Sequence, residues 1–189
     1  MSNKSSKSLF SNMWNIPNLI TILRTLMIPA FILVYFNGSR FVALGIFLLA
    51  GGLDILDGML ARRLNQITNF GKLFDPLSDK IMVFSVFVCH TVRGFIPWPV
   101  AAVYIVTEAI LIIGAYRTVK KGIVMSSVAI GKISQVMITL GLTMAFFHPE
   151  LAAYAFSADT VVLCAADVLA IIALFIYRKK SHEFGNSHN

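Results

Sequence analysis

Long stretches of uncharged, apolar residues are the feature that most limits how this chain can fold. About 20 consecutive apolar residues cross the roughly 30 Å hydrocarbon layer of a bilayer as an α-helix. The chain has 189 residues, 57% hydrophobic and only 13% charged, and a soluble domain of this composition would expose a large apolar surface. The pattern predicts an all-α integral membrane protein with six transmembrane helices, at residues 16–36, 41–62, 72–92, 97–118, 128–147 and 159–177.

Residues 16–177 are therefore expected to form one membrane domain with a short segment on each side. Four apolar residues of segment 1–15 have helical spacing, which predicts either a short helix in the membrane interface or a disordered tail: Leu9, Phe10, Met13 and Trp14. Residues 178–189 are expected to form a basic, solvated tail. Cys89 and Cys164 each lie inside an apolar stretch, where cysteine behaves as a small apolar residue, so no disulfide is expected.

Lysine and arginine are divided unequally between the two ends of the predicted helices. The loops at one end hold only Arg40 and Arg93. Those at the other end hold Lys4, Lys7, Arg62, Arg63, Lys72, Arg117, Lys120, Lys121, Arg178, Lys179 and Lys180. The positive-inside rule places the second set, and both termini, in the cytoplasm. The net charge of +7 then lies where it attracts anionic headgroups and phosphorylated substrates, and no basic soluble domain is available for nucleic acid.

Four aspartates lie inside or at the edge of the second and third predicted helices: Asp54, Asp57, Asp75 and Asp79. An ionised carboxylate at mid-bilayer costs about 2.5–3.5 kcal/mol on insertion scales, so such groups usually face a cavity, a partner or an ion. The first two are i, i+3 and the last two i, i+4, so each pair projects from one helix face. Two adjacent antiparallel helices would turn all four carboxylates toward one cleft, roughly 5–12 Å from the cytoplasmic loop.

Charge balance and ligand type predict two divalent ions in this cleft. Four neighbouring carboxylates repel one another, and two Mg²⁺ or Mn²⁺ ions would neutralise them through the oxygen ligands that these metals prefer. A metal pair suits phosphoryl displacement, with Asp79 as general base for an attacking hydroxyl. Gly58 and Ala61 share the face of the first carboxylate pair and leave room for a ligand, and Arg62 adds a cation for phosphate.

The segment from Asp54 to Asp79 resembles the signature of the CDP-alcohol phosphotransferase family, D-x2-D-G-x2-A-R-x8-G-x3-D-x3-D, with every fixed position filled. The resemblance implies a six-helix membrane enzyme that uses CDP-diacylglycerol. It implies that the four aspartates bind two metal ions and that Asp79 accepts the proton. It also implies that Gly58, Arg62 and Thr68 hold the CDP-lipid, to which Ala61 is added for its small side chain.

The first predicted helix begins Asn15-Ile-Pro-Asn18-Leu-Ile-Thr21-Ile-Leu-Arg24. This segment is similar to the opening of the bacterial phosphatidylglycerophosphate synthases of the family, which implies that Asn18 and Thr21 contact the nucleotide. Arg24, one turn deeper, is interpreted as a cation whose side chain extends to the membrane surface. The resemblance further implies a homodimer in the bacterial inner membrane, with its active site on the cytoplasmic side.

The acceptor half of the site is less specified. Where the synthases open their fourth helix with Arg-Glu, this chain has Thr107-Glu108, whose roles stay unassigned with those of Lys80 and Asp167. Lys132 resembles the lysine of the family's Gly-Lys element and is the preferred ligand for the acceptor phosphate, followed by Arg117. The leading acceptor is sn-glycerol 3-phosphate; the alternatives are phosphatidylglycerol, as in a cardiolipin synthase, and inositol phosphate.

Two non-catalytic functions are alternatives to a phosphotransferase. A cation transporter also places carboxylates inside the membrane, but its acids would be distributed across the bilayer, whereas these cluster toward one side. An inactive scaffold is disfavoured because the tetrad is complete.

Overall fold

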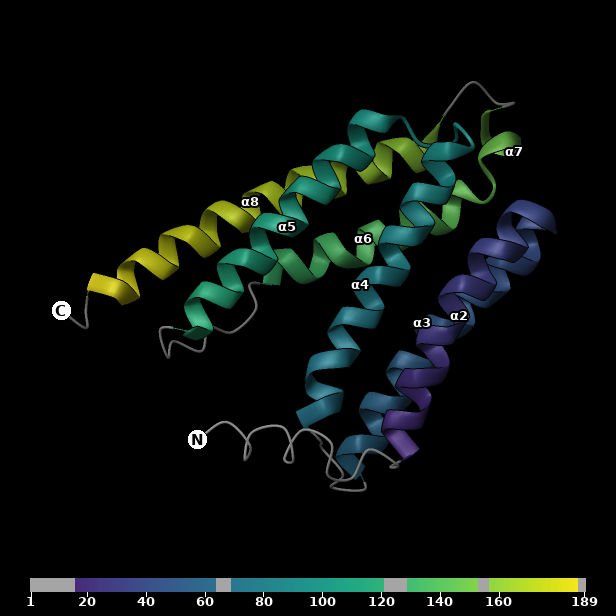
Figure 1. Cartoon of the computed structure of the whole chain (residues 1–189). Coiled ribbons are helices and arrows are strands. Elements are labelled where there is room, and N and C mark those ends of the chain that lie inside the picture. Colours follow the sequence, from purple (N-terminus) through teal and green to yellow (C-terminus); the bar gives the residue numbers. More distant parts are fainter. Residues whose placement is uncertain (1–15, 64–68, 121–128, 153–156, 187–189) are drawn as a thin grey trace. The chain divides into compact units, whose positions relative to one another are not determined.

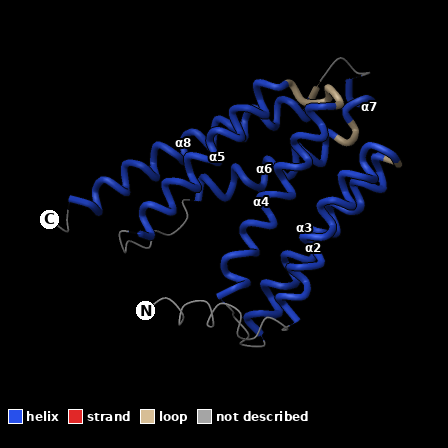
Figure 2. Tube along the Cα trace, in the orientation of Figure 1, coloured by secondary structure: helices blue, strands red, loops and turns tan. Residues whose placement is uncertain are grey.

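A computed structural model of the chain describes residues 16–63, 69–120, 129–152 and 157–186. These residues form seven helices and no strand (Figure 1 and Figure 2). The helices are α2 (Ile16–Asn37), α3 (Arg40–Arg63), α4 (Asn69–Val92), α5 (Trp98–Lys120), α6 (Ala129–Ala145), α7 (His148–Ala152) and α8 (Ala158–Asn186).

Six of these helices coincide with the six predicted segments, so the all-helical class and the helix positions are confirmed. Helix α7 was not predicted, because its five residues are too few to show a periodic pattern. Helix α8 continues to Asn186, nine residues beyond the predicted end at residue 177. Residues 1–15, for which either an interfacial helix or a disordered tail is predicted, lie outside the described residues.

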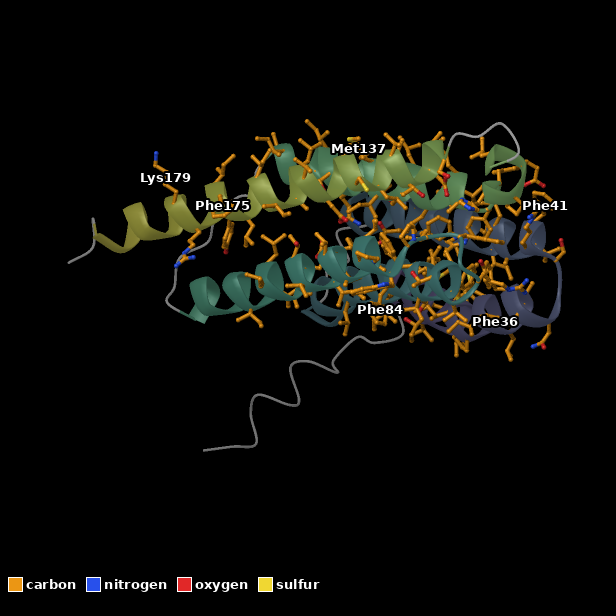
Figure 3. The ribbon with its side chains drawn as sticks, turned by 90° about the horizontal axis from the view of Figure 1, so that it is seen from above. Phe36, Phe41, Phe84, Met137, Phe175 and Lys179 are labelled. Atoms are coloured by element: carbon orange, nitrogen blue, oxygen red, sulfur yellow. The ribbon has the colours of Figure 1, made fainter. Side chains whose placement is uncertain are left out.

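Two of the described helices are long and apolar enough to cross a membrane: α2 over Leu19–Asn37 and α8 over Ala158–Lys179. Only 28% of each stretch is buried, whereas the core helix of a soluble protein would be mostly buried. Large apolar side chains such as Phe36 on α2 and Phe175 on α8 are exposed instead (Figure 3). A lipid surrounding accounts for this exposed apolar surface, so the two helices support a membrane protein.

The chain divides into two compact units, Met1–Cys89 and His90–Asn189. In the first unit, α2 and α3 pack side by side as an antiparallel hairpin (Figure 1). Gly38 and Ser39 form the connection: the Gly38 N–H donates to the Val34 carbonyl at 2.8 Å, which closes α2. Ser39 Oγ accepts from the Phe41 N–H at 3.3 Å, as the cap of a helix N-terminus does. This short connection holds the two helices in one register.

The buried residues of the hairpin are symmetric about Ser39. Tyr35 and Ala43 each lie four positions from it, and both are at most 1% exposed. The next buried pairs are eight and eleven positions away: Phe31 with Phe47, and Ile28 with Ala50. Offsets of 4, 8 and 11 follow one face of an α-helix, so each helix turns a single apolar stripe toward the other. The same register continues to the candidate site.

In the second unit, α8 packs against both α5 and α6. The Ser134 hydroxyl on α6 donates to the Ala166 carbonyl on α8 at 2.9 Å. Further along the same contact, Gly141 lies directly against the buried side chain of Leu163. A glycine here allows the two helices to approach closely, as small residues do in membrane helix pairs.

One end of this unit is a polar and aromatic cluster. His148 Nδ1 lies 2.7 Å from the buried Asp159 carboxylate, and its ring stacks on Phe95. The His90 ring meets Phe146 edge-on at 4.5 Å between ring centroids. Gly94 (φ 76°) ends α4 in the left-handed conformation that glycine tolerates. These contacts join the helix ends of the unit.

The Gly141 contact generates a prediction for stability. A methyl group added at Gly141 would lie 2.7 Å from Cγ and Cδ2 of Leu163. Overpacking of a core typically costs about 1–3 kcal/mol, which outweighs the gain of up to about 1 kcal/mol from replacing a helical glycine by alanine. We expect Gly141→Ala to lower the melting temperature of the detergent-solubilised protein. Gly45→Ala is the control, because no described atom lies within 4 Å of a Cβ at Gly45; it should leave the melting temperature unchanged or raise it, and the opposite order would contradict the contact.

Candidate active site

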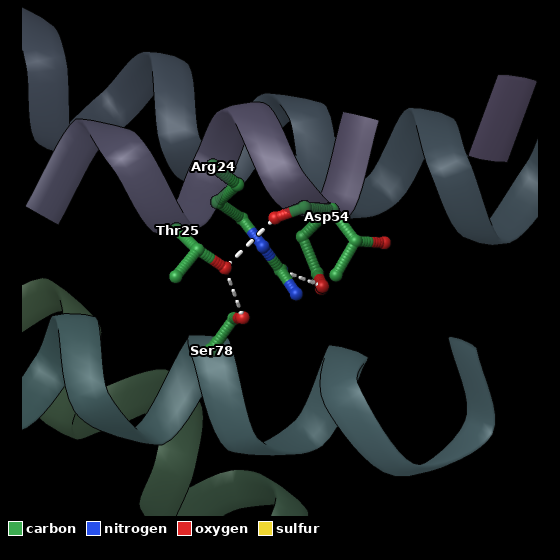
Figure 4. A network of polar contacts seen from close by, with 5 residues as sticks. Arg24, Thr25, Asp54 and Ser78 are labelled. Carbon is green, nitrogen blue, oxygen red and sulfur yellow. Dashed lines mark hydrogen bonds and ion pairs between the residues drawn. The ribbon is translucent and has the colours of Figure 1, made fainter. Parts of the chain in front are cut away.

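The first unit contains a partly buried ion pair between α2 and α3. The Arg24 guanidinium donates from Nη1 to Oδ1 of Asp54 (Figure 4). Arg24 and Asp54 lie 15 positions before and after Ser39, which continues the hairpin register. Apolar side chains meet at 4, 8 and 11 positions from Ser39. At the next offset, 15 positions, a cation and an anion meet.

The two partners differ in their access to solvent. The Arg24 side chain is 2% exposed, whereas that of Asp54 is 40% exposed. A buried guanidinium without a counter-charge is strongly destabilising, so the Asp54 carboxylate is needed where it lies. Asp54 therefore contacts the buried cation while part of its side chain stays accessible.

A second polar contact joins α2 to α4 beside this ion pair. Thr25 Oγ1 donates to the Thr21 carbonyl at 2.9 Å and lies 2.7 Å from Ser78 Oγ. The single hydroxyl proton of Thr25 is used in the first bond, so Ser78 is the donor in the second. Ser78 is buried and directly precedes Asp79, which is half-buried. Consecutive residues of α2 thus contact α3 at Asp54 and α4 beside Asp79 (Figure 4).

The four predicted metal ligands lie on α3 and α4. Asp54 and Asp57 belong to one continuous helix, and so do Asp75 and Asp79, which meets the premise that each pair shares a helix face. The side chains of Asp57 and Asp75 are outside the described set. Within that set, no three His, Cys, Asp or Glu side chains are close enough to hold a metal ion.

The residues predicted to bind the nucleotide lie on α2, on α3 and, in the sequence, between α3 and α4. Thr21 is on α2 and is 2% exposed. It lies 18 positions before Ser39, and Asp57 lies 18 positions after Ser39. The hairpin register therefore places Thr21 and Asp57 at one level. Asn18 lies in the first turn of α2, and its side chain is outside the described set, as are the side chains of Ala61 and Arg62 and the surroundings of Gly58 on α3. Thr68 lies outside the described residues altogether.

The predicted acceptor ligands belong to the second unit. Lys132 lies in the first turn of α6 and is exposed. Arg117 lies near the end of α5, with its side chain outside the described set. Of the unassigned polar residues, Thr107 and Asp167 are buried and Glu108 is half-buried.

Sequence reasoning was wrong about Arg24. A side chain extending to the membrane surface would be exposed, but this one is among the largest fully buried side chains and is paired with Asp54. The signal that would have found the pair is the equal distance of both residues from the hairpin turn. That turn is marked only by a two-residue connection, and apolar periodicity alone does not give its register.

The donor atoms present fit a hard divalent ion. The segment from Asp54 to Asp79 contains no His or Cys, so its acidic ligands are carboxylate oxygens, which suit Mg²⁺ or Mn²⁺ rather than zinc. The contact with Arg24 engages Oδ1 of Asp54, and a carboxylate offers about four lone-pair sites, so capacity remains for an ion.

Comparison with known proteins assigns the class to which this fold and this set of residues belong. The sequence pattern of the CDP-alcohol phosphatidyltransferases matches residues 14–176. A probable phosphatidylglycerophosphate synthase of Mycobacterium tuberculosis is 30% identical over 164 residues, which cover 84% of this chain and 77% of that protein. The chain belongs to the CDP-alcohol phosphatidyltransferase family and is a transferase.

Two further relatives match shorter regions. The CDP-diacylglycerol–glycerol-3-phosphate 3-phosphatidyltransferase of Pseudomonas fluorescens is 54% identical over 72 residues, 36% of this chain and 37% of that protein. The CMP-forming cardiolipin synthase of Homo sapiens is 35% identical over 113 residues, 59% of this chain and 38% of that protein. The chain therefore spans little more than a third of each of these two proteins.

Proposed function

We propose that this enzyme transfers the phosphatidyl group of CDP-diacylglycerol to sn-glycerol 3-phosphate, releasing CMP and forming phosphatidylglycerophosphate. The observation that carries the proposal is the complete eight-position aspartate signature on α3 and α4, next to the buried contacts that α2 makes with both helices. The names of the bacterial relatives support glycerol 3-phosphate as the acceptor.

The proposed site has one half that binds the metal ions and the nucleotide and another half that binds the acceptor. Asp54, Asp57, Asp75 and Asp79 would hold two divalent ions, which the family generally uses. When bound, these ions would polarise the phosphoryl oxygens and stabilise the charge on the entering and leaving oxygens. The nucleotide would lie against Asn18, Thr21, Gly58, Ala61, Arg62 and Thr68.

The chain's own residues position the reactants and move one proton. The acceptor hydroxyl attacks the lipid-side phosphorus of CDP-diacylglycerol, and its proton passes to a carboxylate oxygen of Asp79. A new P–O bond forms to the acceptor, the diphosphate P–O bond breaks, and its electron pair leaves with CMP. Lys132, with Arg117 second, would bind the acceptor phosphate.

The membrane arrangement is part of the proposal. We infer that α2 to α6 and α8 form six membrane spans in the bacterial inner membrane, with both termini and the aspartates toward the cytoplasm. The exposed apolar faces of α2 and α8 and the distribution of lysine and arginine support this arrangement. We further propose one catalytic domain over residues 16–177, assembled as a homodimer.

A panel of acceptors tests the reaction. Purified enzyme with Mn²⁺ or Mg²⁺ is offered radiolabelled CDP-diacylglycerol together with glycerol 3-phosphate, phosphatidylglycerol or inositol phosphate. We expect CMP release with glycerol 3-phosphate and its loss on addition of EDTA. Release of CMP with phosphatidylglycerol alone would mean that the enzyme is a cardiolipin synthase, as the name of the human relative suggests. No release with any alcohol would refute the proposed reaction.

The role of Asp79 is tested by Asp79→Asn. The amide keeps an oxygen for binding but takes up a proton poorly, and general base catalysis contributes about 10²–10⁴-fold. We expect CMP release to fall by this factor while CDP-lipid binding is largely kept. Asp167→Asn is the control: this acid also lies within a helix, it is buried, and its Oδ1 has no hydrogen-bond partner among the described residues, so turnover should persist. Full turnover by Asp79→Asn would exclude the base assignment.

The acceptor half is tested by Lys132→Met. A hydrogen bond to a charged group contributes about 1.5–3 kcal/mol, or roughly 10–100-fold in binding. We expect the KM for glycerol 3-phosphate to rise by this factor with the KM for CDP-diacylglycerol unchanged. Lys179→Met, which removes an exposed lysine of α8, is the control. Equal effects of the two substitutions would mean that Lys132 contributes only general surface charge.

A further inference from the structure

Arg24 is a charged residue in a place where the fold has no structural need for one. It is 1% exposed and continues the buried stripe of α2 that includes Ile28, Phe31 and Tyr35. Replacement of a buried ion pair by apolar side chains of similar volume is often neutral or stabilising. Stability alone therefore does not explain an arginine here, at a level of the hairpin where the buried stripe meets an aspartate of the signature.

The geometry gives the guanidinium a function toward Asp54. Arg24 is enclosed by protein, so it approaches the carboxylate from the buried side and contacts Oδ1. The Asp54 side chain is 40% exposed, so its accessible part is available on the other side. Carboxylates that bind metals are typically held by such partners behind them, and loss of the partner usually costs 10–100-fold in metal affinity.

Charge balance supports the same role. The four proposed ligands carry −4, and Arg24 makes the total −3 before any ion binds. Two divalent ions would then leave these five side chains and the ions with a net charge of about +1. A positive net charge favours the approach of the diphosphate of a CDP-lipid.

We propose that Arg24 is a positioning residue, which holds the Asp54 carboxylate from within the protein so that its accessible oxygen faces a divalent ion. The proposal rests on the proposed function, since it takes Asp54 as a metal ligand. Thr25, the next residue, contacts Ser78 beside Asp79, so the same turn of α2 also adjoins the second ligand helix.

The test measures Mn²⁺ binding rather than turnover. Arg24→Lys keeps the positive charge but replaces the planar guanidinium by a single ammonium group on a different stem, so it changes the orientation of Asp54 and not the local charge. Mn²⁺ titrations of the purified full-length protein in detergent, followed by electron paramagnetic resonance, give the dissociation constant. We expect that constant to rise about 10-fold or more in Arg24→Lys.

Phe31→Leu is the matched control. Phe31 lies on the same helix, is fully buried and carries no charge, so its replacement lowers the melting temperature without touching the site. It should leave Mn²⁺ affinity unchanged. If Arg24→Lys does not remain monodisperse, Arg24→Gln is titrated in its place. Because Gln removes a positive charge, which by itself would strengthen Mn²⁺ binding, a weaker affinity in Arg24→Gln supports the positioning role and an equal or tighter affinity overturns it.

The outcomes separate this proposal from the proposed function. If the wild-type protein binds no Mn²⁺, the metal site itself fails. If it binds Mn²⁺ and Asp54→Asn weakens binding, but Arg24→Lys binds as tightly as the wild type or more tightly, the metal site stands and the role of Arg24 is overturned.

Discussion

The ion pair of Arg24 and Asp54 is the interaction that ties the α2–α3 hairpin to the candidate site. Carboxylates are costly in an apolar chain, and at Asp54 the fold balances that cost with a cation buried in the neighbouring helix. The pair is possible because the α2–α3 hairpin keeps one register from its turn to this level. The apolar stripe thus does more than stabilise the hairpin. It also determines which residues of the two helices meet at the candidate site.

The helices and the candidate ligands were predictable to different degrees. Long apolar runs predicted six of the seven described helices, because burial in lipid demands continuous helix. The five residues of α7 and the extension of α8 to Asn186 were not predicted, because neither has a distinct apolar pattern. The four aspartates were found from charge, spacing and family resemblance. Their helical context is confirmed, whereas their metal binding stays a prediction.

Contacts between helices were the part that sequence patterns did not specify. Arg24 was misinterpreted because its partner is 30 residues away and pairing depends on the register of a hairpin. The Thr25–Ser78 contact is of the same kind, since neither hydroxyl has a sequence signal that points to the other. The acceptor ligands depend on α5 and α6, which belong to the second compact unit, and only their positions on those helices follow from the sequence.

The symmetry of the hairpin also sets the depth of the site. At 1.5 Å per residue, the 15 residues from Ser39 to Asp54 extend roughly 22 Å along α3. If the hairpin spans a hydrocarbon layer of about 30 Å, Asp54 lies most of the way across it from the turn. One residue inserted into either arm would rotate the residues beyond it by about 100° and separate Arg24 from Asp54. The lengths of α2 and α3 between the turn and the site are therefore fixed together, because a residue added to either arm changes both the level and the helix face of every residue beyond it.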